Sequence, residues 1–124
     1  RRKKIVAGLL AVDRYEETLS VHLRTALRKI SGLKLYGPPE GEESTTTTSF
    51  TIEGIHSNEI STALGKRGIY TWDGDFYAVT LVNDVLKLKR QGGLVRIGLA
   101  PYNTIEDIDR AISAIQSIAV KGKD

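Results

Sequence analysis

Residues 94–109 read LVRIGLAPYNTIEDID, and they decide the fold because they join the clearest strand of the chain to its clearest helix start. The apolar run over 94–99 predicts a strand. Thr104 is a residue type that caps helix N-termini, and Asp107 stands three positions later, where a capping box places an acidic side chain. A helix is therefore predicted over 105–120, and its buried side carries Ile108, Ile112, Ile115 and Ala119.

Working outward from this stretch, the upstream sequence alternates helical and extended patterns. Thr48, Phe50 and Ile52 alternate along one face of a β-rich run, and His56 or Ser57 is placed to cap the helix that follows. Upstream of residue 94, the prediction has helices over 4–30, 57–67 and 76–88 and strands over 33–36, 46–53 and 69–72. This order predicts an α+β fold: a small antiparallel or mixed sheet of three or four strands, with helices packed on one face.

The first helix is predicted to be the longest, and its apolar residues form one stripe. They are Ile5, Leu9, Val12, Leu19, Leu23, Ala26 and Ile30, at spacings of three, four or seven. Gly32 is expected to end this helix, because glycine adopts the left-handed conformation that ends helices.

Farther along the chain, the tripeptide Asp73-Gly74-Asp75 is typical of a turn and is expected to separate a strand from the helix over 76–88.

Composition excludes several kinds of protein. The 124 residues contain no cysteine, so disulfides, thiolate nucleophiles and Cys-ligated metal centres are ruled out. The two histidines, His22 and His56, are too few for a His-rich metal site, and no metal is expected. The apolar run over 5–12 is far shorter than the roughly 20 residues of a membrane helix. Methionine is absent even at position 1, so residues 1–124 are expected to be a single domain cut from a longer chain.

Charge is unevenly spread, which leaves one alternative function open. Nine of the 18 basic residues fall within positions 1–34, against three acidic ones. Such a basic segment could bind nucleic acid, and the chain would then be a stand-alone α+β interaction module. A solvated helix face explains the same pattern, and no aromatic motif for stacking RNA bases appears on a predicted strand. We therefore expect neither a nucleic-acid partner nor a membrane partner.

Two segments carry candidate site residues. Residues 68–78 gather aromatic side chains beside two aspartates and two glycines, so Trp72, Asp73 and Tyr77 are candidates for a pocket wall. Packing of aromatic residues around a turn is the alternative. Arg96 interrupts an otherwise apolar strand, where a buried guanidinium would need an anionic partner. That partner is either an internal carboxylate or the carboxylate of a ligand gripped by the guanidinium fork.

Taken together, these segments resemble the C-terminal domain of class V aminotransferases, a family that includes the cysteine desulfurases and their relatives. The resemblance rests on Gly68-Ile69 through Gly74 to Ala78, on 94–100, on Tyr102-Asn103-Thr104, and on the acidic run over 106–109. It covers nearly the whole chain. The combination of the arginine strand with Tyr-Asn-Thr is the most specific part.

The resemblance implies a pyridoxal-phosphate enzyme of fold type I acting on an amino acid. Such enzymes are usually homodimers, and a cytoplasmic location is expected. Their Schiff-base lysine lies in a large domain, and no lysine here matches its motif, so the chain alone should be inactive and hold no catalytic or cofactor-binding residue. Arg96 matches the arginine that grips the α-carboxylate of the substrate.

Three positions depart from the family pattern. Tyr77 stands where related desulfurases carry a reactive cysteine, and Trp72 replaces the arginine of that loop. Gly98 replaces the serine that follows Arg-Ile in the arginine strand. A phenol cannot form a persulfide, so ordinary cysteine desulfuration through this loop is not expected. The resemblance leaves the substrate and the reaction type open.

Overall fold

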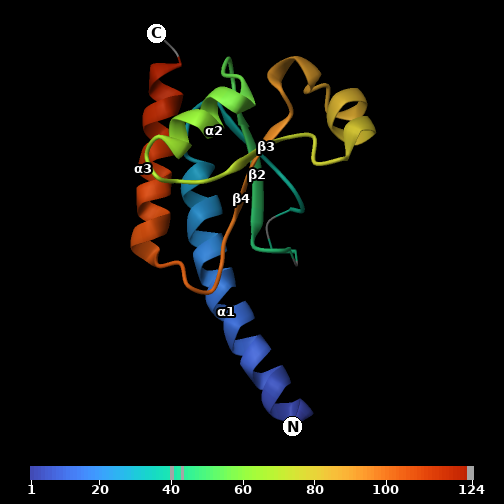
Figure 1. Cartoon of the computed structure of the whole chain (residues 1–124), viewed down its shortest axis with the longest axis vertical. Coiled ribbons are helices and arrows are strands. Elements are labelled where there is room, and N and C mark those ends of the chain that lie inside the picture. The colour runs from blue at the N-terminus through green and yellow to red at the C-terminus, as the bar shows by residue number, and fades with distance from the viewer. Residues whose placement is uncertain (40, 43, 123–124) are drawn as a thin grey trace.

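A computed structural model describes residues 1–39, 41–42 and 44–122 of the chain. Its elements, in chain order, are α1 (Arg2–Leu27), β1 (Leu33–Tyr36), β2 (Thr47–Ile52), α2 (Ser57–Gly65), β3 (Trp72–Gly74), a π-helical turn η1 (Thr80–Val85), a 3-10 turn η2 (Lys89–Gln91), β4 (Leu94–Gly98) and α3 (Ile105–Lys121). The strands form one sheet in the order β1-β2-β4-β3, and every neighbouring pair is antiparallel. The helices α1, α2 and α3 lie on one side of this sheet, whereas η1 and η2 lie on the other (Figure 1). The predicted α+β class is confirmed.

The two faces of the sheet have different roles because successive side chains of a strand point to opposite sides. Val95 and Ile97 of β4 belong to the main core, which the three helices cover. Leu94 belongs instead to a satellite core with Val82 and Leu88. Arg96 shares the side of Leu94, so it lies on the face of the sheet away from α1, α2 and α3.

The main core draws on every long element. Its fully buried side chains are Leu19, Leu23 and Leu27 of α1, Phe50 and Ile52 of β2, Ile60 and Leu64 of α2, Val95 of β4 and Ile115 of α3. The predicted buried face of β2 is confirmed, since Thr48, Phe50 and Ile52 are all buried, but Thr51 on the opposite face is buried too. No helix of the described residues is both long and apolar enough to span a membrane.

Both helix caps that the sequence indicates are present. Thr104 accepts a hydrogen bond from the Asp107 backbone N–H at 3.2 Å, and the Asp107 carboxylate accepts one from the Thr104 N–H at 3.1 Å. This is a complete capping box at the start of α3. At α2 the cap is His56, whose Nδ1 accepts a hydrogen bond from the Asn58 N–H at 3.3 Å.

The expectation of one buried stripe along the whole first helix is wrong in its first half. Ile5 is 54% exposed and Leu9 is 65% exposed, and Val12 is also exposed. This part of α1 projects past the sheet, where no other described element reaches it (Figure 1). The helix also ends at Leu27, not at residue 30, and Leu27 is buried whereas Ala26 is only half-buried.

The expectations for 69–88 are wrong in three respects. The strand lies at Trp72–Gly74, so Asp73 and Gly74 are paired residues of β3 and not a turn. The turn comes later: the Asp75 carbonyl accepts a hydrogen bond from the Ala78 N–H at 2.8 Å. Phe76 has φ 53° and Tyr77 has φ 64°, values that an α-helix cannot contain. The predicted helix over 76–88 is thereby reduced to η1 and the neighbouring turns.

Gly93 holds β3 and β4 together by close backbone approach. Its φ is +81°, and a Cβ at this position would overlap the carbonyl group of Gly74. Its own carbonyl accepts a buried hydrogen bond from the Ser57 hydroxyl at 2.8 Å, which ties the start of β4 to α2.

Replacing Gly93 with alanine is expected to destabilise the fold by roughly 1–3 kcal/mol, through left-handed strain and the displaced Gly74 carbonyl. Urea unfolding followed by circular dichroism measures this change. The matched control is Gly8→Ala in α1, where a Cβ meets nothing within 4 Å, and it should stabilise the helix slightly or have no effect. Equal stability of the two variants would contradict this account of Gly93.

Candidate functional site

Arg96 lies at the centre of the candidate site, and the structure corrects the expectation that it is buried. It is exposed, because its position in β4 points away from the helices that cover the core. Its cross-strand neighbours are Ser49 on β2 and Trp72 on β3. Arg96 thus lies on the open face of the sheet, the face away from α1, α2 and α3, where the satellite core covers only the part around Leu94. The apolar character of the strand comes from Val95 and Ile97, which face the main core, and from Leu94, which faces the satellite core.

The guanidinium of Arg96 has an aromatic neighbour and makes no ion pair with the residues that the structure describes. The Phe76 ring stacks against it, with the Arg96 Cζ atom 4.3 Å from the ring centroid. Among the residues that the structure describes, no carboxylate lies within ion-pair distance of Arg96. The sequence allowed two partners for Arg96, an internal carboxylate or the carboxylate of a ligand. The internal carboxylate is not found within the described part of the chain.

The three candidate wall residues fall in different places. Trp72 is 69% exposed and stands beside Arg96 as its cross-strand neighbour. Asp73 pairs with Val95, so it faces the helix side, where its carboxylate accepts a hydrogen bond from the Asn58 side chain at 3.5 Å. Tyr77 is fully exposed on the loop after β3. The structure therefore brings only Trp72 next to Arg96.

Phe76 is a site residue that sequence reasoning did not single out. The aromatic cluster of 68–78 was the only signal available, and it does not say which ring meets Arg96. The choice depends on the left-handed backbone at Phe76 and Tyr77. Such a conformation is rare for bulky residues and could not be inferred from the sequence.

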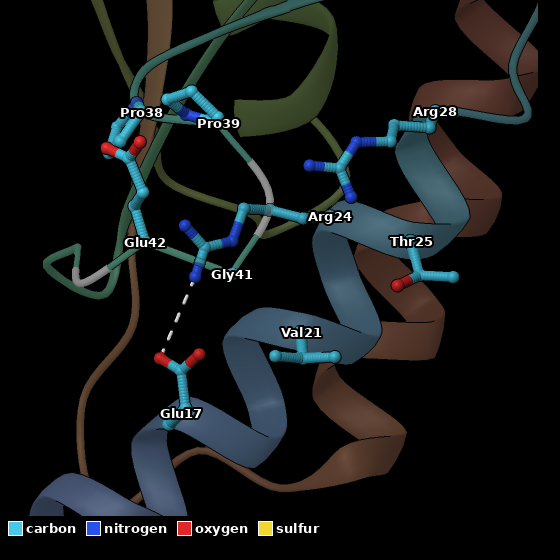
Figure 2. Close-up of a pocket in the computed structure, with 9 residues that line it drawn as sticks. All are labelled: Glu17, Val21, Arg24, Thr25, Arg28, Pro38, Pro39, Gly41 and Glu42. Atoms are coloured by element: carbon cyan, nitrogen blue, oxygen red, sulfur yellow. Dashed lines mark ion pairs between the residues drawn. The ribbon is translucent and has the colours of Figure 1, made fainter.

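Two of the cavities among the described residues lie elsewhere on the surface. One is a groove of about 300 Å³ at the end of β4, flanked by the exposed rings of Tyr70 and Tyr102. The other, of about 50 Å³, lies between α1 and the Pro38-Pro39 segment (Figure 2). In this second cavity Arg24 pairs with Glu17 at 3.7 Å and donates a hydrogen bond to Ser44. The charge of Arg24 is therefore compensated within the chain. The volume of this cavity suits water molecules more than a substrate.

The described residues do not fit a pyridoxal-phosphate cradle or a metal site. All lysines within the described part of the chain are exposed, so none lies in the desolvated pocket that activates a Schiff-base lysine. No group of three or more His, Asp or Glu side chains among the described residues could hold a metal ion. What the site offers is a cationic fork on an open sheet face, suited to an anion.

Comparison with known proteins identifies a family match and several similar sequences. The model of the family Aminotransferase class-V matches residues 5–111. A protein named "Probable cysteine desulfurase" from Staphylococcus aureus (strain Mu50) is 28% identical over 109 residues, which is 88% of this chain and 25% of that protein. One with the same name from Xylella fastidiosa (strain Temecula1) is 31% identical over 111 residues, which is 90% of this chain and 25% of that protein.

Solved structures agree in fold. The apo structure of a cysteine desulfurase from Thermococcus onnurineus NA1 superposes with a TM-score of 0.79 at 20% identity, covering 97% of this chain and 29% of that one. A "NIFS-like protein" gives a TM-score of 0.74 at 25% identity, covering 94% of this chain and 30% of that one. The chain thus spans about a quarter of the length of the curated relatives it matches.

Proposed function

The chain belongs to the class-V aminotransferase family, and from this premise we propose that it is the substrate-side, C-terminal small domain of a pyridoxal-phosphate enzyme acting on an amino acid. The chain matches about a quarter of the length of the relatives named as probable cysteine desulfurases. This partial coverage supports the proposal that the chain is part of a larger enzyme. We place the cofactor in the remainder of that enzyme, because the residues described here do not fit it. The chain by itself is accordingly expected to be inactive.

One observation carries the proposal: Arg96 presents its guanidinium on the open face of the sheet without an internal carboxylate among the described residues. A guanidinium can donate two parallel hydrogen bonds to one carboxylate, which fixes both the position and the orientation of that group. We propose that Arg96 binds the α-carboxylate of the substrate in this way. Trp72, the neighbour of Arg96 on β3, would then form the wall of the substrate site on that side.

We propose that the loop over 72–78 does not take part in cysteine desulfuration. The chain contains no cysteine, and Tyr77 stands where the family resemblance expects the sulfur-accepting residue. A phenol oxygen cannot carry a persulfide sulfur. By the same resemblance we propose a homodimer in the cytoplasm, without a nucleic-acid or membrane partner.

The experiment that tests the function compares amino acids with the amines that lack their α-carboxylate. The full-length protein that carries this chain is loaded with pyridoxal phosphate, and the absorbance of the cofactor is followed during titration. One set of titrations uses the amino acids L-alanine, L-cysteine and L-aspartate, and the other uses the amines ethylamine and cysteamine. The amino acids should perturb the spectrum at concentrations about ten- to a hundred-fold lower than the amines, because a charged hydrogen-bonded pair contributes roughly 1.5–3 kcal/mol. Equal response to both sets, or failure to hold the cofactor, would refute the proposal. The isolated 124-residue chain is the control and should show no turnover.

A further inference from the structure

We propose that Phe76 is a positioning residue, which holds the guanidinium of Arg96 in the orientation that receives a carboxylate. This inference rests on the proposed function of Arg96 and adds a second residue to its site. It starts from the cation–π contact of Arg96 with Phe76, in which the Arg96 Cζ atom lies 4.3 Å from the ring centroid.

Phe76 is itself firmly anchored. It is half-buried and packs against the satellite core of Val82, Leu88 and Leu94. Leu94 lies two residues before Arg96 on the same strand and the same face. The ring therefore bridges a fixed apolar cluster and an otherwise long, flexible side chain. Arginine has many rotamers, so a rigid neighbour reduces the entropy that carboxylate binding would otherwise cost.

The backbone around Phe76 is strained in a way that serves this placement. Phe76 and Tyr77 both have positive φ, a conformation that is unfavourable for residues other than glycine. The Asp75 side chain accepts a hydrogen bond from the Tyr77 N–H at 3.1 Å, and its carbonyl accepts one from the Ala78 N–H at 2.8 Å. These two hydrogen bonds offset part of the strain and direct the Phe76 ring over the sheet.

Phe76 and a carboxylate would use different features of Arg96. The cation–π contact places the Arg96 Cζ atom over the Phe76 ring and does not use the guanidinium N–H groups as hydrogen-bond donors to an oxygen. Those N–H groups are the donors that bind a carboxylate in two-pronged fashion. The cross-strand neighbours Ser49 and Trp72 flank Arg96 along the sheet. Phe76 can therefore hold the guanidinium while its donors bind a carboxylate.

The test uses the full-length protein with ¹⁵N-labelled arginine, and it reads the Nε–Hε signal of Arg96 by NMR. The signal is assigned by its loss in Arg96→Lys. The ring current of Phe76 should displace it in the wild type, and Phe76→Leu should remove that displacement. Sodium acetate is then titrated as the carboxylate probe, with sodium chloride as the salt control.

Phe76→Leu should raise the Kd for acetate about two- to fivefold, the range of an exposed cation–π contact. Phe76→Tyr keeps a ring and should bind acetate like the wild type. The matched control is Tyr70→Leu, which removes an aromatic ring that is 89% exposed and has no contact with Arg96 among the described interactions. It should leave the acetate Kd unchanged.

Each contrary outcome has a separate meaning. If acetate binds wild type and Phe76→Leu equally, the positioning role is refuted while the carboxylate site stands. If Tyr70→Leu weakens binding as much as Phe76→Leu does, the effect belongs to general loosening and the positioning role is again refuted. If acetate does not move the wild-type Arg96 signal at all, the proposed carboxylate site fails, and the role of Phe76 fails with it.

Discussion

Replacing Arg96 with alanine should lower kcat/KM of the full-length enzyme about ten- to a hundred-fold, the loss expected for a charged hydrogen-bonded pair worth roughly 1.5–3 kcal/mol. The loss should fall mostly on KM if the carboxylate is held equally in the ground and transition states. Thermal stability should change little, because Arg96 is exposed and forms no ion pair with the described residues.

Arg96→Lys is the conservative companion variant. An ammonium keeps the charge but cannot offer two parallel donors, so the lysine should recover only part of the lost kcat/KM. Both variants are measured by steady-state kinetics and by melting temperature. A lowered melting temperature with unchanged kinetics would show that Arg96 has a structural role and would overturn its assignment to the substrate carboxylate.

Replacing Phe50 with alanine should destabilise the fold by roughly 3–5 kcal/mol, a large share of the stability of an ordinary domain. Phe50 is the largest fully buried side chain, and it lies in β2 between its partners Leu35 on β1 and Val95 on β4. Alanine would leave a cavity in the layer between the sheet and the three helices. Collapse around that cavity would be limited, because the backbone on both sides is held by the sheet hydrogen bonds.

Urea unfolding of the Phe50→Ala variant measures this loss. Tyr102→Ala is the matched control, since it truncates an aromatic side chain that is 84% exposed, and it should change the free energy of unfolding by no more than about 0.5 kcal/mol. A Phe50→Ala variant as stable as the control would mean that the core is not centred on β2.

The parts of the fold that depend on local interactions could be predicted from the amino-acid sequence. The strand at Leu94–Gly98 and the capping box of Thr104 with Asp107 follow from residues adjacent in the chain, and both are present as predicted. The alternation around Phe50 also has a period that any single strand displays. The resemblance to class V aminotransferases rested on the same stretches and is confirmed by the family match over residues 5–111.

Contacts between elements that are distant in the chain could not be predicted from the sequence, because they depend on how the elements pack together. The stripe of α1 is periodic from Ile5 onward, yet only its second half is covered, because burial depends on what packs against a helix. Arg96 lies in an apolar strand but on its open face, since alternation alone does not say which side the helices occupy. The stacking of Phe76 on Arg96 required two left-handed residues, and that strain is maintained by the satellite core and the Asp75 turn, contacts that no local propensity encodes.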